Sequence, residues 1–278
     1  MPAPSRAPSS CAPIGIFDSG LGGLSVLRHV RALLPREHLL YFADSGFAPY
    51  GGRPEPEIVA RTLAIGDFLL DQGAKALVVA CNTATAAAIA ALRARHPGLP
   101  VVGVEPGLKP AAAMTRSGLV GVLATQRTVE SERFILLREQ VMAASGVRFH
   151  VQACPGLADQ VEKGELGSPA TARLLQRYLG PLLAEGADTV VLGCTHYPFL
   201  LPLIEDICRR SGAAPVQVVD TGVAVARQLA RLLEAGDLLC RADSGSVLCH
   251  TTGSAASVAT ASQRLLGLEV QVRSIGTA

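Results

Sequence analysis

Short apolar runs alternate with longer amphipathic segments along almost the whole chain. The runs are rich in Val, Leu and Ile, and several end on a polar residue or a cysteine. They predict strands at 13–19, 39–45, 74–81, 119–125, 147–154, 187–194 and 246–253, and a further strand beginning within 214–222. Apolar residues at helical spacing predict helices at 20–34, 56–73, 129–146, 169–186 and 257–267.

This alternation of strand and helix indicates parallel βαβ units. The strands are nearly continuous in apolar character, as expected when helices cover both faces of a sheet. The pattern therefore predicts an α/β fold in which parallel sheets are flanked by helices.

An internal repeat suggests two related lobes. Gly73 and Gly186 each precede a cysteine by the same distance, and Cys81 and Cys194 lie 113 residues apart, as do the two glycines. The stretch at 14–20 resembles the one at 120–126, an offset of 106. We expect two pseudo-symmetric α/β lobes with the active site in the cleft between them. Their expected bounds are a disordered tail at 1–12, a first lobe at 13–105 plus 216–278, and a second lobe at 106–215.

Composition and charge exclude several classes of protein. The 278 residues carry a net charge of +2, which is too balanced to indicate a nucleic-acid or membrane-surface partner. No apolar run approaches the ~18 residues that a membrane span requires. The N-terminal stretch is rich in Pro and Ser and lacks the apolar core of a secretory signal. A cytoplasmic location is the expectation.

The seven cysteines are odd in number, and none shows CxxC spacing. This argues against a disulfide framework and a zinc site, and reduced thiols are expected in the cytosol. We interpret five of them as small core residues: Cys11, Cys154, Cys208, Cys240 and Cys249.

The other two cysteines, Cys81 and Cys194, end predicted strands and are followed by polar residues that cap helices well. Ligands of open α/β sheets bind beyond the carboxyl ends of the strands. A cysteine at the start of a helix also experiences the helix N-terminus, which favours the thiolate. Further polar residues follow the ends of predicted strands, namely Asp18, Ser19, Asp44, Asn82, Thr83, Thr125, Thr195, His196, Asp220 and Thr221.

Related thiols on two facing lobes would stand on opposite sides of one bound molecule. Inverting a stereocentre requires a base on one face of a carbon and an acid on the other. Asp18 could orient or deprotonate Cys81, and His196 could do the same for Cys194. Each also has a structural interpretation, Asp18 as a helix cap and His196 as a capping or core residue.

Cofactor motifs are weak or absent. The glycines at 20, 22 and 23 do not form GxGxxG, and there is no GxxxxGK[ST]. Asp44 stands where an acid that binds a nucleotide ribose would be, but the evidence for a nucleotide-binding site is weak. The three lysines do not follow predicted strands with the other candidates, which argues against a pyridoxal Schiff base.

Eight motifs together resemble bacterial glutamate racemase over about residues 14–267. In chain order they are GIFDSGLGGLSV, YFADSGFAPYG, ACNTAT, VVGVEPGLKPA, ATQRTVES, VEKGEL, LGCTHYPFL and VVDTG. The resemblance implies two α/β lobes and interconversion of L- and D-glutamate without a cofactor or metal. The D-isomer would supply peptidoglycan synthesis. Members are often dimers, so a homodimer is possible.

The resemblance also implies roles for individual residues. Cys81 and Cys194 would be catalytic, the first deprotonating D-glutamate and the second L-glutamate, with Asp18 and His196 assisting. Asp44 and Glu162 would have supporting roles. The substrate would be contacted by Asp18, Ser19, Tyr50, Gly51, Asn82, Thr83, Thr125, Thr195 and His196. Gly46, Phe47, Gln126 and Arg127 depart from the expected pattern, which leaves substrate affinity open.

Three alternatives stay open at this stage. A related two-cysteine racemase could act on aspartate or a hydantoin. A hydrolase or transferase could use one cysteine alone. A two-lobed amino-acid-binding module would bind glutamate without exchanging its α-proton.

Overall fold

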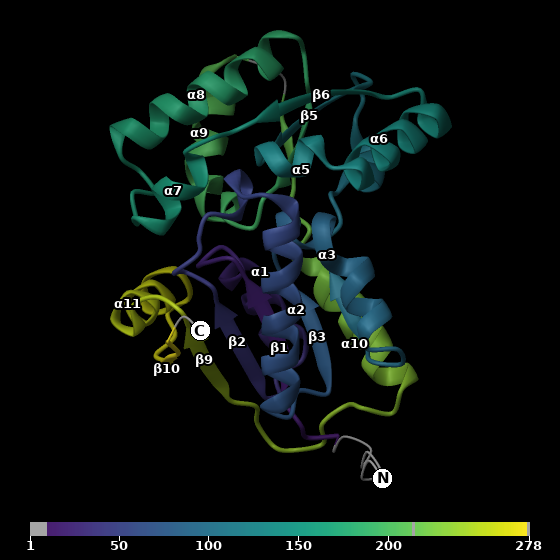
Figure 1. Cartoon of the computed structure of the whole chain (residues 1–278). Helices are drawn as coiled ribbons and strands as arrows, with labels where there is room; N and C mark the ends of the chain where they lie inside the picture. The colour runs from purple at the N-terminus through teal and green to yellow at the C-terminus, as the bar shows by residue number, and fades with distance from the viewer. Residues whose placement is uncertain (1–9, 213–214, 277–278) are drawn as a thin grey trace.

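Two parallel β-sheets, each enclosed by helices, form the chain in the computed structural model, which describes residues 10–212 and 215–276. The lower lobe in Figure 1 holds the N-terminal strands together with the C-terminal segment, and the upper lobe holds the middle of the chain. The predicted α/β fold with helix-flanked parallel sheets is confirmed.

The first sheet has the strand order β10-β9-β2-β1-β3-β4, and every neighbouring pair is parallel. Its strands are β1 (Ile14–Asp18), β2 (Leu39–Ala43), β3 (Ala76–Val79), β4 (Val101–Gly103), β9 (Val247–Thr251) and β10 (Gln271–Ser274). The sequence did not predict β4 or β10. The first spans only three residues, and the second is largely exposed, so neither presents a long apolar run.

Helices cover both faces of this sheet. On one face, α2 (Glu55–Asp71) and α3 (Asn82–Arg95) pack their Leu and Ile side chains against β1, β2 and β3. On the other face lie α1 (Leu24–Leu33), α10 (Gly222–Ala235) and α11 (Ala255–Leu266). The first helix begins at Leu24, four residues later than predicted, because residues 20–23 form a turn.

The second sheet has the order β6-β5-β7-β8 and is also parallel. Its strands are β5 (Leu119–Ala124), β6 (Arg148–Ala153), β7 (Thr189–Gly193) and β8 (Gln217–Val219). One face is covered by α4 (Leu108–Met114) and α6 (Glu132–Ser145). The other is covered by α8 (Pro169–Ala184) and α9 (Leu201–Arg210).

Four short helical segments lie where the lobes approach each other. The first lobe contributes η1 (Tyr50–Gly52), and the second contributes α5 (Gln126–Glu130), α7 (Leu157–Glu162) and η2 (Tyr197–Leu200). Among them, α5 contacts η1 and α7 contacts η2. The helix predicted at 129–146 is divided at Ser131, which ends α5 and caps α6.

The two sheets repeat one topology, because β2-β1-β3-β4 corresponds to β6-β5-β7-β8. The register repeats as well. Ile14 pairs with Ala76 between β1 and β3, and Val120 pairs with Thr189 between β5 and β7. These partners are related by the same offsets of 106 and 113 residues that the sequence shows. The internal repeat is therefore a repeat of structure.

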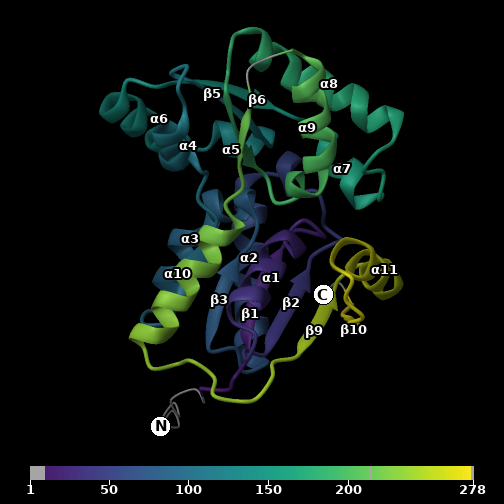
Figure 2. The ribbon, with the colours of Figure 1, turned by 180° about the vertical axis from the view of Figure 1, so that it is seen from behind.

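The expected return to the first lobe at residue 216 needs correction. Strand β8 pairs with β7, so the second sheet continues to Val219. The chain then enters α10, and Figure 2 shows this segment descending from the upper lobe into the lower one. The boundary was misplaced because a three-residue strand leaves almost no pattern of its own.

The expectation that all cysteines are reduced is wrong for two of them. Cys11 and Cys240 form a disulfide between residues 229 positions apart. The predicted tail at 1–12 is thus anchored at its end, while residues 1–9 lie outside the described part of the chain. Spacing could not reveal this pair, because the tertiary fold brings the two segments together. Cys154, Cys208 and Cys249 are free and buried, as predicted.

A buried ion pair lies beside the disulfide. Lys75 Nζ is 2.5 Å from Glu37 Oε2, and both side chains are almost completely buried. Lys75 also donates to the carbonyl groups of Ser10 and Leu238, and Cys240 N donates to Glu37 Oε1 at 2.8 Å. Each cysteine is therefore within two residues of a group that solvates this ion pair.

Within residues 10–212 and 215–276, no helix combines the length and apolar character that a membrane span needs. The same residues contain no group of three His, Cys, Asp or Glu side chains placed to hold a metal ion.

Candidate active site between the lobes

Cys81 stands between β3 and α3 and caps that helix. Its Sγ accepts a hydrogen bond from Ala84 N at 3.4 Å and lies 3.7 Å from Ser19 Oγ. Burial raises the pKa of this thiol to about 12, and the charge of Asp18 acts in the same direction. The helix N-terminus does favour the thiolate, as expected from the sequence, but the loss of solvation outweighs it.

Asp18 ends β1 and is completely buried. Its Oδ2 accepts from Gly20 N at 2.9 Å, and its Oδ1 accepts from Thr195 Oγ1 of the other lobe at 3.1 Å. Burial raises the pKa of Asp18, and the nearby charge of His196 opposes that shift. Ser19, and not Asp18, is the side chain that hydrogen-bonds Cys81 in the described structure. Asp18 therefore links the lobes and acts on Cys81 through its charge.

Cys194 follows β7 and lies in a chain of three polar groups. Its Sγ is 3.5 Å from His196 Nδ1, and His196 Nε2 is 2.6 Å from Glu162 Oε1. Burial alone lowers the pKa of His196, but its hydrogen bonds to Cys194 and Glu162 raise that pKa well above its usual range. Glu162 is held in turn by Leu21 N at 2.7 Å. This is the arrangement of a thiol, a base and a group that orients the base.

The turn at residues 20–23 packs closely against side chains of both lobes. A Cβ added to Gly22 would lie 2.4 Å from His196 Nδ1, and one added to Gly20 would lie 2.1 Å from Glu162 Oε1. Ser25, just beyond the turn, donates to Thr195 O at 2.8 Å. Only glycine allows the backbone of the first lobe to approach the second lobe this closely.

The two thiols lie on either side of one contact between the lobes. Cys81 bonds Ser19, the adjacent Asp18 accepts from Thr195 Oγ1, and Thr195 follows Cys194 in the chain. The charge of Cys194 also contributes to the raised pKa of Cys81. Their side chains are nearly buried, with residue exposures of 5% for Cys81 and 6% for Cys194. Repeated strand ends from the two lobes thus meet at a common, enclosed position.

Other predicted residues line the same contact between the lobes. Thr83 Oγ1 is 3.0 Å from Thr125 Oγ1, and Thr125 caps α5. A Cβ on Gly51 would lie 3.2 Å from Thr125 Cβ. Asn82 Nδ2 is buried and has no hydrogen-bond partner among the described residues. A buried donor left in this way is suited to a ligand oxygen.

Three predicted acids occupy different places. Glu162 is part of the site, next to His196. Asp44 lies one layer behind it, where it accepts from Tyr50 OH at 2.5 Å and pairs with Arg61 at 2.6 Å. Asp220, at the end of β8, pairs with His29 at 3.4 Å and accepts from Gly222 N, so it serves the connection to α10.

Sequence reasoning missed two residues of this second layer, Arg61 and Thr252. Both contact Asp44, one from the middle of α2 and the other beyond β9. Neither has a sequence signal, because an arginine in an amphipathic helix and a threonine after a strand are ordinary. Only the fold brings them to the same carboxylate.

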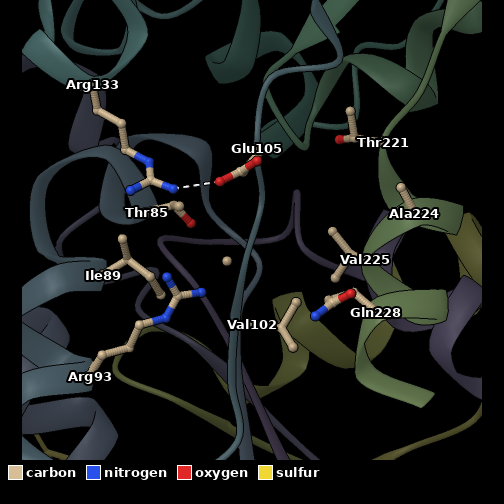
Figure 3. A pocket seen from close by; sticks show the side chains of 11 residues that line it. Thr85, Ile89, Arg93, Val102, Glu105, Arg133, Thr221, Ala224, Val225 and Gln228 are labelled. Atoms are coloured by element: carbon tan, nitrogen blue, oxygen red, sulfur yellow. Dashed lines mark hydrogen bonds and ion pairs between the residues drawn. The ribbon is translucent and has the colours of Figure 1, made fainter. Parts of the chain in front are cut away.

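A cavity of about 300 Å³ lies beside the two segments that connect the lobes (Figure 3). Arg133 of α6 and Glu105 form an ion pair of 2.5 Å at its rim, and Arg93 of α3 lies below them. Among the candidate residues of the sequence analysis, Thr221 lines this cavity, whereas Cys81, Cys194 and their bonded partners do not.

Comparisons with known proteins show the family of this chain. Residues 15–229 match the family model described as Asp/Glu/Hydantoin racemase. A protein of Ectopseudomonas mendocina named glutamate racemase is 54% identical over 263 residues, covering 95% of this chain and 98% of that protein.

Solved structures show the same fold. Glutamate racemase RacE1 of Bacillus anthracis aligns with a TM-score of 0.84 at 32% identity, covering 95% of this chain and 97% of that one. The Escherichia coli glutamate racemase, solved with L-glutamate and the activator UDP-MurNAc-Ala, aligns with a TM-score of 0.80 at 34% identity, covering 96% and 99%.

Proposed function

This chain belongs to the Asp/Glu/hydantoin racemase family, and we propose that it interconverts L-glutamate and D-glutamate by two-base proton transfer between Cys81 and Cys194. The family makes the chain an amino-acid racemase. The choice of glutamate rests on relatives at 53–58% identity that carry the name glutamate racemase.

One observation carries the mechanism. Two thiols follow equivalent strands of a repeated topology, and the Gly20–Gly23 turn lies between their immediate neighbours. A single nucleophile has no use for an equivalent thiol in the other lobe. Removal of a proton from one face of a carbon and its return to the other face requires two such groups.

With L-glutamate bound, the Cys194 thiolate takes the α-proton while the Cys81 thiol donates a proton to the opposite face. The electron pair of the broken C–H bond is shared with the α-carboxylate and then forms the new C–H bond. With D-glutamate the two sulfurs exchange roles. Burial favours the protonated Cys81 thiol before L-glutamate binds, which suits a proton donor; turnover of L-glutamate leaves Cys81 as the thiolate that can deprotonate D-glutamate. His196 holds the proton released by Cys194, and Glu162 stabilises the resulting imidazolium.

The carboxylates of glutamate need donors in the same enclosed space. The start of α3 offers free backbone N–H groups, and such a helix terminus binds carboxylates as readily as phosphates. The Asn82 amide and the hydroxyl groups of Thr83 and Thr125 add side-chain donors. Since both sulfurs are nearly buried, substrate enters when the lobes separate, and closing them excludes water from the reaction.

The D-glutamate formed would supply peptidoglycan synthesis, and the expected setting is the cytoplasm. No cofactor takes part in the proposed steps, because the thiols and their partners supply both the base and the acid. A homodimer stays a prediction.

The test is racemisation in D₂O by the wild-type protein and by the Cys81→Ser and Cys194→Ser variants. We expect the wild type to abolish the optical activity of L-glutamate and to place deuterium at Cα of the product. Each serine variant should racemise at least about 100-fold more slowly. Cys208→Ser, which changes a free cysteine of α9, is the matched control.

Three outcomes would favour an alternative. Wild-type rates in both directions for either serine variant would rule out the two-base scheme. Faster turnover of aspartate than of glutamate would identify a different substrate. Tight glutamate binding without deuterium uptake would indicate a binding module.

A further inference from the structure

The buried carboxylate of Asp44 lies behind the site and helps to hold the loop at 47–53 of the first lobe. Its Oδ1 accepts from Arg61 Nη2 at 2.6 Å and from Thr252 Oγ1 at 2.8 Å. Its Oδ2 accepts from Arg61 Nε at 3.0 Å and from Tyr50 OH at 2.5 Å. Asp44 is completely buried, so its charge depends on these donors for solvation.

Arg61 holds the same loop in a second way. Its guanidinium lies over the ring of Phe47, 3.8 Å from the ring centroid. Arg53, at the far end of the loop, donates to Phe47 O at 2.6 Å. Stacking on a ring and a two-pronged bond to a carboxylate are both properties of a planar guanidinium that a lysine lacks. Arg61 therefore contacts the loop at 47–53 directly at Phe47 and reaches it at Tyr50 through Asp44.

This loop carries contacts from the first lobe to the second. Gly51 packs against Thr125, and Arg53 O accepts from Arg127 Nε of α5 at 2.9 Å. Phe47 and Arg127, which depart from the pattern expected for the family, both bond to Arg53 of this loop. Any displacement of the loop would change how the lobes meet over the site.

We propose that Arg61 is a positioning residue for racemisation: through Asp44 and Tyr50 it holds the 47–53 loop in the place where the lobes close over the substrate. The inference rests on the proposed function, because it concerns the closed form of the same site. Arg61 touches no reacting atom. Its effect passes through the Asp44 carboxylate to the Tyr50 hydroxyl, and from there to Gly51 and Thr125.

This role predicts a particular kinetic signature. A loop that helps to close the lobes contributes to substrate binding, so its loss should raise KM more than it lowers kcat. A merely structural weakening of the lobe would reduce the amount of active enzyme, which lowers apparent kcat and leaves KM unchanged. The ratio of the two effects separates the interpretations.

The experiment measures kcat and KM for both glutamate isomers in Arg61→Met, Arg61→Lys, Tyr50→Phe and the Arg61→Met/Tyr50→Phe double variant. We expect Arg61→Met to lower kcat/KM at least 10-fold, mainly through KM, and Arg61→Lys to lie between it and the wild type. The double variant should lose little more than the worse single variant, because both changes break one chain of contacts.

Arg95→Met is the matched control. Arg95 forms the same two-pronged bond, to Asp67, on the outer surface of the same lobe, and should keep kcat/KM within twofold of the wild type. Circular dichroism and thermal unfolding establish that each variant is folded. If both Arg61 variants fail to fold, Thr252→Val decides, since it removes one donor from Asp44 and should also raise KM.

Two results would overturn the inference while leaving the proposed function intact. One is a wild type that racemises glutamate together with a folded Arg61→Met variant whose KM equals that of the wild type. The other is a double variant whose fold loss in kcat/KM equals the product of the losses of Arg61→Met and Tyr50→Phe. A wild type that does not racemise glutamate would instead overturn the proposed function.

Discussion

His196 Nε2 lies 2.6 Å from Oε1 of Glu162, and the other ring nitrogen of His196 faces the sulfur of Cys194 at 3.5 Å. Burial of the imidazole opposes its protonation, yet these two partners raise the pKa of His196 well above its usual range. The imidazolium therefore persists at neutral pH and is lost only as the pH rises through this raised pKa. In the proposed mechanism its loss removes the cation beside Cys194.

With L-glutamate as the substrate, activity should be lost at high pH. Glu162→Gln should consequently shift this loss to lower pH. The amide keeps the size of the side chain but not the charge that stabilises the imidazolium. At pH 8 we expect kcat/KM to fall about 10- to 100-fold, with a smaller effect at pH 6. The measurement is a pH–rate profile in the L-to-D direction. Glu165→Gln changes an exposed residue beyond the end of α7 and is the control, and parallel profiles for the two variants would contradict this role for Glu162.

The Gly20–Gly23 turn gives a second prediction. A Cβ on Gly22 would lie 2.4 Å from His196 Nδ1 and 2.6 Å from Thr195 Oγ1, so Gly22→Ala must displace the imidazole or the turn. A displacement near 1 Å in a catalytic group typically costs about 100-fold in rate. We expect a kcat loss of that order in a folded protein. Gly52→Ala has open space around its Cβ and should retain activity, so equal losses in both variants would refute the steric argument.

Much of the fold could be predicted because the physical signals were local. Apolar strand runs such as 74–81 and 187–194 can be recognised in the sequence itself. The equal offsets between the two glycines and between Cys81 and Cys194 reflect two lobes with one topology. The same offset placed both cysteines at strand ends. The proposed common site then required only that the two lobes face each other.

The features that were missed depend on contacts between distant segments. The short strand β8 ends the second sheet by pairing with β7, and its own three residues carry no clear pattern. Asp44 could be marked as a supporting acid, but its partners Arg61 and Thr252 come from 17 and 208 residues away. The raised pKa of Cys81 follows from burial between lobes, which helix position alone does not reveal.

The buried pair of Lys75 and Glu37 should be important for stability and irrelevant to catalysis. Lys75→Met would leave Glu37 as a buried carboxylate without its counter-ion, which typically costs about 3–5 kcal/mol. Chemical denaturation should show this loss, and kcat of the folded fraction should not change, because Lys75 precedes β3 and the thiols lie beyond the carboxyl ends of the strands. Lys75→Met/Glu37→Met removes both charges and should recover much of the stability. A double variant no more stable than Lys75→Met would contradict this account.

The disulfide beside this pair should also stabilise the first lobe. Cys11–Cys240 closes most of the chain into one loop, so it restricts the unfolded state, and breaking a native disulfide typically costs about 2–5 kcal/mol. Reduction also frees the segments whose carbonyl groups solvate Lys75. Under denaturing conditions without reductant, five of the seven cysteines should react with a thiol reagent, and all seven after reduction. Reductant should lower the unfolding midpoint of the wild type and leave that of Cys11→Ser/Cys240→Ser unchanged. Seven reactive thiols without reductant, or an equal response of the two proteins, would show that this pair does not stabilise the enzyme as a disulfide.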